Sequence, residues 1–348
     1  MLWWRLGFAP FNHIHSNMAI DPSLNQSSFI DKTLLLEPGT LQDKVIQQTK
    51  RAIESGALIS IPTEYEFVQQ DGIQFLVRML INLARKEEAK QQTSTKNDKD
   101  FNPFLPYEAN LFVTDVSKTH LCLLNKYNVV DQHILIVTRS FEEQTSLLTL
   151  QDFVALWACL AEYDGLVFYN GGEAAGASQR HKHLQLVPYL VAPDVPNIPI
   201  EVYLESRIAE VSDFNQIITI PELPFVHAVA AIDPAWLQSP GMAATVTLER
   251  YYELLKAVRI PIREITLNQE DLSGTRSMPT TNYLQAAPYN LLVTRRWMLL
   301  IPRSQPSFEG IPVNSLGFAG ALLVHNPEQL ATLKTLKPLS LLRHVAIS

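Results

Sequence analysis

The chain has 348 residues, and its 28 Lys and Arg against 35 Asp and Glu give a formal net charge of −7. Hydrophobic residues make up 47% and charged residues 18%, a composition typical of globular proteins and unlike that of disordered ones. The negative balance argues against a general nucleic-acid coat protein, which needs excess Lys and Arg to hold phosphate backbones. A small anionic ligand in a local basic pocket stays compatible with it.

The cysteine content and the absence of long apolar runs favour a cytoplasmic protein. Cys122 and Cys159 both lie in apolar segments, which is no disulfide framework and fits a reducing compartment. No apolar run approaches the ~18 residues that a membrane helix needs. The first nine residues lack the cleavage pattern of a signal peptide. We therefore expect neither a membrane nor a nucleic-acid partner.

The N-terminal part of the chain predicts helices around a short strand. Residues 1–40 form a partly disordered leader, and helical spacing then predicts a helix over residues 39–55. A short apolar run at 57–62 predicts a strand. Residues 75–83 show helical spacing again, with a strand as the alternative at the start of this segment. Residues 86–100 carry eight charged side chains and no apolar stripe, which predicts a mobile loop.

A first core unit follows. Apolar runs at 121–127 and 133–139 flank a turn and predict two strands. Thr149 and Asp152 have capping-box spacing, and they open a helix that Gly165 ends. A strand at 166–170, a glycine-bearing loop at 170–180 and a strand at 181–190 complete the unit. Residues 191–224, rich in Pro and polar side chains, predict a long connection.

A second unit begins near residue 225. A helix is predicted at 243–258, and a hairpin over 289–302 turns at Arg295-Arg296. Asn326 caps the last helix, with Pro327 at its first position. The order of elements echoes the first unit, which predicts two related halves, 41–224 and 225–348. We expect an α+β fold with mixed, mainly antiparallel sheets flanked by helices.

The strongest local motif is the run His181-Lys182-His183-Leu184-Gln185. On a strand, side chains alternate between faces, so His181, His183 and Gln185 point the same way. Leu184 and Leu186 then point into a core. Two imidazoles and an amide are thus expected to share one surface.

The loop before this strand, residues 170–179, is small and contains Gly171, Gly172 and Gly176. Such loops let backbone N–H groups approach phosphate oxygens closely. A phosphate-binding loop beside paired histidines favours phosphorus chemistry with histidine as nucleophile. Two alternatives remain open from the residues alone: a metal site, since neutral imidazole binds zinc, and histidines of purely structural role.

The segments Tyr169–Gly172 and Gly176–Gln185 resemble the signature of the diadenosine tetraphosphate phosphorylases, also called ATP adenylyltransferases. These belong to the histidine-triad superfamily, on the branch of galactose-1-phosphate uridylyltransferase. Several further segments are similar to the same family: Ser55–Leu58, Ile61–Thr63, Leu124–Val130 with His133, Phe141–Gln144, Tyr289-Asn290 and Asn314–Gly320. The resemblance runs from about residue 41 to residue 345.

The resemblance implies a covalent mechanism. His183 matches the nucleophile, which attacks the α-phosphorus of a dinucleoside polyphosphate and forms a nucleotidyl-histidine that inorganic phosphate then cleaves. With diadenosine tetraphosphate the products are ATP and ADP, and the reaction is reversible. His183 must be neutral to attack, and its other ring nitrogen needs an orienting acceptor, for which a backbone carbonyl near His181 is expected. Gln185 stands where hydrolytic relatives carry a third His, and an amide delivers no proton.

The resemblance also implies a set of nucleotide- and phosphate-binding residues. Asn290 belongs to a matching hairpin, and Arg295 and Arg296 follow it; a solvated turn is the alternative for this arginine pair, as a solvated strand end is for Lys126. The full set is Asn125, Lys126, Asn170, Gly171, Gly176, Ala177, Ser178, Gln179, Asn290, Arg295 and Arg296.

The implied partners are dinucleoside polyphosphates, ATP, ADP and inorganic phosphate, with Mg²⁺ as the companion of the polyphosphate and no metal held by the protein itself. A second H-x-H-x-Q is absent from the sequence, so one active site per chain is expected. The resemblance also implies a monomer, because a histidine-triad dimer holds two such units and the two halves of this chain would supply both. Three other functions share these residues: a relative that uses another acceptor, a nucleotide sensor without turnover, and a zinc-binding protein.

Overall fold

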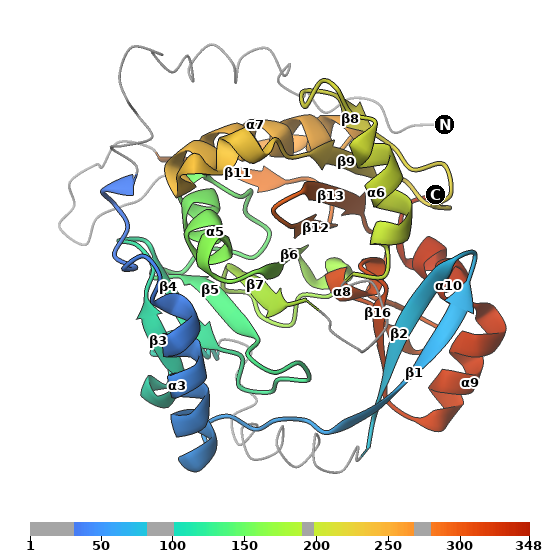
Figure 1. Ribbon diagram of the computed structural model, residues 1–348, viewed down its shortest axis with the longest axis horizontal. Helices are drawn as coiled ribbons and strands as arrows, with labels where there is room; N and C mark the ends of the chain where they lie inside the picture. The colour runs from blue at the N-terminus through green and yellow to red at the C-terminus, as the bar shows by residue number, and fades with distance from the viewer. Residues whose placement is uncertain (1–30, 82–100, 190–197, 268–279) are drawn as a thin grey trace.

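One nine-stranded sheet runs through both halves of the chain in the computed structural model, which describes residues 31–81, 101–189, 198–267 and 280–348 (Figure 1). Every neighbouring pair in it is antiparallel. In spatial order its strands are β3 (Phe112–Asp115), β4 (His120–Leu124), β5 (Ile134–Thr138), β7 (His183–Pro188), β6 (Gly165–Gly171), β12 (Tyr289–Val293), β13 (Trp297–Pro302), β9 (Ala228–Ala231) and β8 (Ile217–Ile218).

Three smaller sheets are also present among the described residues. In one, β2 (Ile73–Leu80) lies between β1 (Thr63–Gln70), which is antiparallel to it, and β16 (Ala321–Val324), which is parallel. The other two are the pairs β10 (Ile262–Leu267) with β11 (Thr280–Gln285), and β14 (Ser307–Phe308) with β15 (Ile311–Pro312). The strand β16 from the end of the chain thus pairs with β2 from its beginning.

The helices pack on both sides of the large sheet. The α-helices are α3 (Leu41–Glu54), α5 (Leu150–Glu162), α6 (Glu201–Ala209), α7 (Pro240–Ala257), α8 (Ser315–Phe318), α9 (Pro327–Leu336) and α10 (Pro338–Val345). The same described ranges contain the short 3₁₀ helices η1 (Ala109–Leu111), η2 (Glu173–Ala175) and η3 (Pro234–Gln238). Helices α5 and α7 pack against each other over one face of the sheet, and α9 and α10 lie beside β1 and β2 (Figure 1).

Burial on both faces explains why the central strands are continuous apolar runs. One core cluster fills the space between the sheet and α3, α5 and α7, and a second lies on the opposite face, against β2 and the C-terminal helices. All residues of β4, β5, β6, β12 and β13 are buried. A fully buried strand has no polar face, so its sequence does not alternate.

The expected α+β architecture with mainly antiparallel sheets is confirmed, and so are most elements of the two core units. Thr149 and Asp152 form the predicted capping box of α5, and Asn326 caps α9 through the backbone N–H of Gln329. The leader up to residue 30 and the charged segment 86–100 lie outside the described residues. Residues 31–36 are described, with Leu36 buried.

Three predictions were wrong. In place of the helix favoured over 75–83, strand β2 occupies residues 73–80, as the strand alternative at the start of the segment allowed, because a short apolar run fits a buried strand as well as a helix. Residues 57–62 form no strand of a sheet, although the backbone N–H of Ile59 donates to the carbonyl of Lys126. In the described part of the predicted 191–224 connection, helix α6 and strand β8 occur.

Candidate active site

Strand β7 places the histidine motif at the centre of the large sheet, between β5 and β6. His183 pairs with Val137 of β5, and Gln185 pairs with Leu135 of β5 and Phe168 of β6. Leu184 and Leu186 are buried in the cluster beneath α5, as the alternation predicted. The two imidazoles and the amide of the motif therefore lie on the face of β7 away from α5.

His183 has one ring nitrogen fixed and the other available. Its Nδ1 lies 2.8 Å from the backbone carbonyl of His181, and because a carbonyl only accepts, the ring proton is on Nδ1. This is the orienting acceptor that the sequence predicted. Burial, together with the neighbouring His181 ring, lowers the pKa of His183 to about 4. At neutral pH the side chain is therefore an uncharged imidazole whose Nε2 carries a lone pair, as a nucleophile requires.

His181, by contrast, has both ring nitrogens engaged. Its Nε2 donates to the carbonyl of Thr138 at 2.8 Å, which leaves Nδ1 to accept from the Asn102 amide at 2.9 Å. Burial lowers the pKa of His181 as well. Phe104 packs against both histidine rings, with centroid distances of 5.6 Å to His181 and 5.3 Å to His183. Both ring nitrogens of His181 are thus engaged, whereas His183 has hydrogen-bond partners for Nδ1 only among the described residues.

Gln185 belongs to a series of hydrogen-bonded side chains that leads away from His183. Its Oε1 lies 3.0 Å from Nε2 of His133, and Nδ1 of His133 lies 3.1 Å from the amide nitrogen of Asn125. Burial lowers the pKa of His133 to about 4, so its ring is neutral too. Asn125, predicted to bind nucleotide, is thus placed behind Gln185 through the ring of His133.

Gln144 fixes the backbone of the nucleophile. Its side-chain oxygen accepts from the N–H of His183 at 2.9 Å, and its amide donates to the carbonyls of His183 at 3.1 Å and Asn170 at 3.0 Å. Gln144 is buried. One amide therefore ties β7 at His183 to the end of β6, where the glycine-bearing loop begins.

The loop after β6 depends on its glycines. Gly172 and Gly176 have φ values of 96° and 90°, a region that side chains other than glycine rarely adopt. A Cβ at Gly176 would lie 2.9 Å from the carbonyl oxygen of Val313, too close for any other residue. Of the predicted loop residues, Ser178 is exposed, whereas Ala177 and Gln179 are half-buried. The glycines thus determine the path of the loop, whose first residue, Asn170, is connected to His183 through the amide of Gln144.

A buried polar cluster supports this loop from below. The side-chain oxygen of Asn170 accepts from the amide of Asn290 at 2.9 Å and from the hydroxyl of Ser315 at 2.8 Å. Arg303 donates to Asn290 and to the carbonyl of Ala175 within the loop, and its remaining N–H groups reach other backbone carbonyls. Burial lowers the pKa of Arg303 to about 9, so the side chain still carries its charge at neutral pH. Asn170 and Asn290, both predicted site residues, meet in this cluster.

The predicted arginine pair lies away from His183, at the other end of β12. Arg295 donates to the carbonyls of Leu160 and Ala161 at the C-terminal end of α5, and Arg296 pairs with Glu201 and Glu205. The register explains this location: Asn290 faces Asn170 across β12 and β6, and the turn after β12 therefore lies at the opposite end of the strands. Lys126 pairs with Glu108 at 2.8 Å and is partly exposed.

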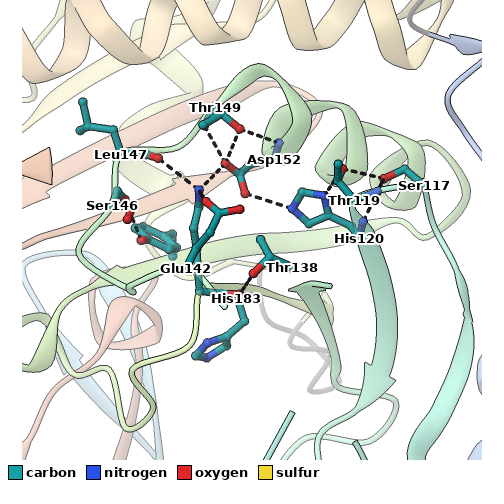
Figure 2. A network of polar contacts seen from close by, with 12 residues as sticks. Ser117, Thr119, His120, Thr138, Glu142, Ser146, Leu147, Thr149, Asp152 and His183 are labelled. Atoms are coloured by element: carbon teal, nitrogen blue, oxygen red, sulfur yellow. Dashed lines mark hydrogen bonds and ion pairs between the residues drawn. The ribbon is translucent and has the colours of Figure 1, made fainter. Parts of the chain in front are cut away.

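A charged network lies on the other face of β7 (Figure 2). Lys182 is fully buried, and its Nζ is 2.7 Å from Asp152 and 2.8 Å from Glu142. Asp152 also accepts from Nε2 of His120 at 3.0 Å and from the backbone N–H of Thr149. Figure 2 shows the ring of His183 pointing away from this network.

Several residues of the site were missed by the sequence analysis: Asn102, Thr138, Gln144, Asp152, Lys182 and Arg303 as contacts, and His133 as part of the Gln185 chain. Lys182 stands inside the motif itself, and the signal available for it was the alternation that places it on the same face as Leu184 and Leu186. The others lie far from the motif in sequence.

Neither a metal centre nor a membrane helix is found in the described part of the chain. There, no group of three or more His, Cys, Asp and Glu side chains is arranged to hold a metal ion. No helix within the described ranges is long and apolar enough to cross a bilayer.

Comparison with known proteins identifies relatives of both halves. The family model of the Ap4A phosphorylase N-terminal domain matches residues 31–206, and that of the ATP adenylyltransferase C-terminal domain matches residues 221–348. The chain is 28% identical over 286 residues to diadenosine tetraphosphate phosphorylase 2 of Saccharomyces cerevisiae. This alignment covers 76% of the chain and 80% of the yeast protein.

Two solved structures share the fold. The crystal structure of yeast Ap4A phosphorylase matches with a TM-score of 0.66 and 25% identity, covering 88% of this chain and 95% of the yeast chain. Its complex with Ap4A matches with a TM-score of 0.62 and 23% identity, covering 88% and 98% of the two chains.

Proposed function

The chain belongs to the Ap4A phosphorylase family of nucleotidyltransferases, and from this premise we propose how its own residues carry the reaction. The enzyme cleaves diadenosine tetraphosphate (Ap4A) with inorganic phosphate into ATP and ADP. The observation that supports His183 as the nucleophile is its neutral imidazole, whose proton is held on Nδ1 by the His181 carbonyl.

In the first step, the Nε2 lone pair of His183 forms a bond to the α-phosphorus of Ap4A. The bond from that phosphorus to the bridging oxygen breaks, and its electron pair leaves with ATP. In the second step, an oxygen of inorganic phosphate attacks the same phosphorus, the P–N bond breaks, and its electrons return to Nε2. ADP is released, and the histidine is neutral again. Splitting one displacement into two lowers each barrier.

Most of the remaining predicted residues are assigned to substrate contacts or to the support of the phosphate-binding loop. The backbone of Gly171 and of Gly176–Gln179 binds phosphate oxygens, as glycine-bearing loops do. The hydrogen bond between Asn170 and Asn290 fixes the position at which this loop begins. Gln185 donates its amide to a phosphate oxygen, and Lys126 supplies a positive charge at the edge of the site. Arg295 and Arg296 are left out, because both are paired at the other end of β12.

Mg²⁺ enters with the polyphosphate in this proposal. The side chains around His183 are imidazoles and amides, and the nearby carboxylates of Asp152 and Glu142 are already bound by Lys182. Such a donor set does not form a magnesium cage, which requires oxygen ligands free to coordinate. The protein therefore contributes no step through the metal.

We also propose that the enzyme works as a cytoplasmic monomer without nucleic-acid or membrane partners. Both cysteines are buried and unpaired, as suits a reducing compartment. Both halves of the chain contribute strands to the sheet that carries His183, so one chain is sufficient to build the site. Light scattering during size-exclusion chromatography tests the monomer.

The first experiment incubates the purified protein with Ap4A and Mg²⁺, with and without inorganic phosphate, and separates the products by ion-exchange chromatography. ATP and ADP that form only with phosphate support the proposal. AMP formed without phosphate would indicate a hydrolase, and no product would indicate another acceptor or a sensor without turnover.

A second experiment tests the nucleophile. His183→Ala is expected to lose at least about a thousandfold in kcat while its circular dichroism stays unchanged, because the covalent intermediate cannot form. His344→Ala, at an exposed histidine of α10, is the control and should keep wild-type activity. Turnover by the folded His183 variant within tenfold of wild type would remove His183 from the mechanism.

A further inference from the structure

The hydrogen-bond partner of Gln185 decides which end of its amide faces the substrate. The Oε1 atom of Gln185 is 3.0 Å from Nε2 of His133. His133 directly precedes β5, the strand next to β7. His133 is only 7% exposed, and its ring packs against Phe168 with a centroid distance of 5.9 Å. The contact is therefore shielded from water and held by the packing of the ring.

A neutral imidazole has one donor nitrogen and one acceptor nitrogen. The hydrogen bonds that join Asn125, His133 and Gln185 can therefore have only two donor-to-acceptor directions. In the first, Asn125 donates to Nδ1 of His133, and Nε2–H donates to Gln185. In the second, His133 donates to Asn125 and accepts from the Gln185 amide. The atoms in contact, the Asn125 amide nitrogen with Nδ1 and the Gln185 oxygen with Nε2, correspond to the first direction.

The chemistry of the substrate also favours the first direction. The phosphate oxygens of a polyphosphate are anionic acceptors, so they need a donor opposite them. The first direction leaves both N–H bonds of the Gln185 amide available to these oxygens. The second would turn the carbonyl oxygen of Gln185 toward them, which loses a hydrogen bond and adds repulsion.

We propose that His133 is a positioning residue that holds the Gln185 amide with its NH₂ group toward the polyphosphate. This inference rests on the proposed function, since it assigns Gln185 a phosphate oxygen as its partner. The hairpin that carries Asn125 and His133 is itself closed, because the backbone N–H of Asn125 donates to the carbonyl of His133 at 2.9 Å. The orientation of the amide is thus set from residues 125–133 before substrate binds.

A consequence concerns the choice of acceptor. With its NH₂ group toward the phosphate and its oxygen bound to His133, Gln185 has no basic atom available for the proton of an attacking water. Inorganic phosphate already carries negative charge on the oxygen that attacks, so it needs no such base. The His133–Gln185 pair therefore favours phosphate over water as acceptor of the adenylyl group.

The kinetic test uses a double-mutant cycle. His133→Phe keeps an aromatic ring but removes both nitrogens, and it is expected to lower kcat for phosphorolysis about 10- to 100-fold. Gln185→Leu should lower it by at least as much, and the two changes together should cost no more than Gln185→Leu alone, because His133 acts through Gln185. Full additivity of the two losses, or wild-type kcat in His133→Phe, would overturn the proposal.

The matched control is His227→Phe. His227 is another buried histidine, whose Nδ1 donates to the carbonyl of Phe225 and whose Nε2 accepts from the N–H of Ile220. It precedes β9, at the other side of the sheet from β7. This variant should keep kcat within about threefold of wild type, which separates the loss of a buried imidazole from the loss of the Gln185 contact.

A conservative variant and a spectroscopic measurement remain informative if His133→Phe does not fold. His133→Gln retains a donor toward Gln185 and should keep kcat within about fivefold of wild type. In the wild-type protein, ¹⁵N chemical shifts of the histidine rings, assigned with His133→Gln, should show the His133 proton on Nε2. A proton on Nδ1, or a folded His133→Gln as impaired as Gln185→Leu, would contradict the proposal. If wild type made no ATP and ADP from Ap4A, the proposed function would fail while the tautomer measurement stayed valid.

Discussion

The two faces of β7 differ in charge: the histidines of residues 181–183 are neutral on one face, and the lysine between them is charged on the other. On the face away from α5, His181 and His183 are neutral and donate to backbone carbonyls. Toward α5, Lys182 is charged and pairs with Asp152 and Glu142. Charge is thus placed where an opposite charge compensates it, and the nucleophile keeps its lone pair because burial disfavours its protonation.

The ion pairs on the charged face fix the backbone that carries the two neutral histidines. Lys182 lies between the two histidines, and its ion pairs connect β7 to the N-terminal turn of α5, where Asp152 caps the helix. Its own peptide groups are bonded as well, since its N–H donates to the carbonyl of Glu142 at 2.8 Å. The carbonyl of His181, which orients the nucleophile, is therefore part of a peptide fixed from both sides.

The largest expected effect comes from breaking the charged face. Lys182→Met should lower the free energy of unfolding by about 3–5 kcal/mol, because it leaves Asp152 as a buried carboxylate without its cation. Urea denaturation at pH 7.5 measures the change. Lys182→Met combined with Asp152→Asn should recover at least about 1 kcal/mol, since no unpaired charge then remains. A single variant within 1 kcal/mol of wild type would show that the pair does not anchor β7.

The pH range of this stabilisation follows from the directions of the pKa shifts. Burial opposes the charged form of Asp152, but Lys182 and the hydrogen bond from His120 outweigh it and hold its pKa well below the usual value. The ion pairs likewise outweigh burial and raise the pKa of Lys182. The contribution is complete above the unfolded Asp pKa of about 3.9 and below the unfolded Lys pKa of about 10.4, and it is lost outside that window. The difference between wild type and the double variant Lys182→Met/Asp152→Asn, which carries neither titrating group, should therefore stay constant from about pH 5 to pH 9.

The neutral face should respond to pH within that same window. The pKa of His183 is about 4 in the folded protein, against about 6.5 in the unfolded chain, so below pH 6.5 the unfolded state binds the proton first. Stability from His183 is full above pH 6.5 and falls by about 3 kcal/mol as the pH drops to 4. Urea denaturation of wild type and His183→Gln at several pH values should show this loss only in wild type.

The matched control is His344→Gln, which removes an exposed histidine and should keep the wild-type pH profile. Equal slopes for wild type and His183→Gln would show that the nucleophile is not held neutral by burial. The same lowered pKa predicts that kcat/KM stays flat from neutral pH to about pH 5, since Nε2 remains unprotonated there.

The contrast between the faces also shows how far the sequence could go. Alternation along 181–186 predicted which side chains share a face, and the capping box predicted where α5 begins. These depend on neighbours two to four residues apart, whose geometry the local backbone determines. The same local reasoning failed at residues 75–80, because a short buried strand and a buried helix turn have similar composition.

The partners of the motif could not be predicted in this way. His133 and Gln185 are 52 residues apart, and Asn102 and His181 are 79 apart, so each contact depends on the order and register of distant strands. The arginine pair illustrates the same point: the turn at Arg295 was predicted correctly, but only the antiparallel pairing of β12 with β6 shows that it points away from the nucleophile. Register between distant strands is set by the whole core rather than by adjacent residues.

The smallest predicted change in stability, and the most direct link between the faces, concerns Gln144. Residues 142–144 run antiparallel to 180–183, so Glu142 reaches Lys182 on one face while the Gln144 amide brackets the backbone of His183. Gln144→Leu should cost about 1–3 kcal/mol of stability, because backbone groups of His183 and Asn170 lose their partner in a buried place. It should also lower kcat by about tenfold with little change in KM, since Nε2 of His183 shifts relative to the bound phosphorus. Gln48→Leu is the matched control: its single amide bond to the carbonyl of Asn110 lies on the surface of α3, so both parameters should stay at wild-type values. If Gln144→Leu raised KM and left kcat unchanged, Gln144 would support the loop after Asn170 rather than the nucleophile, and the two faces of β7 would be coupled through Lys182 alone.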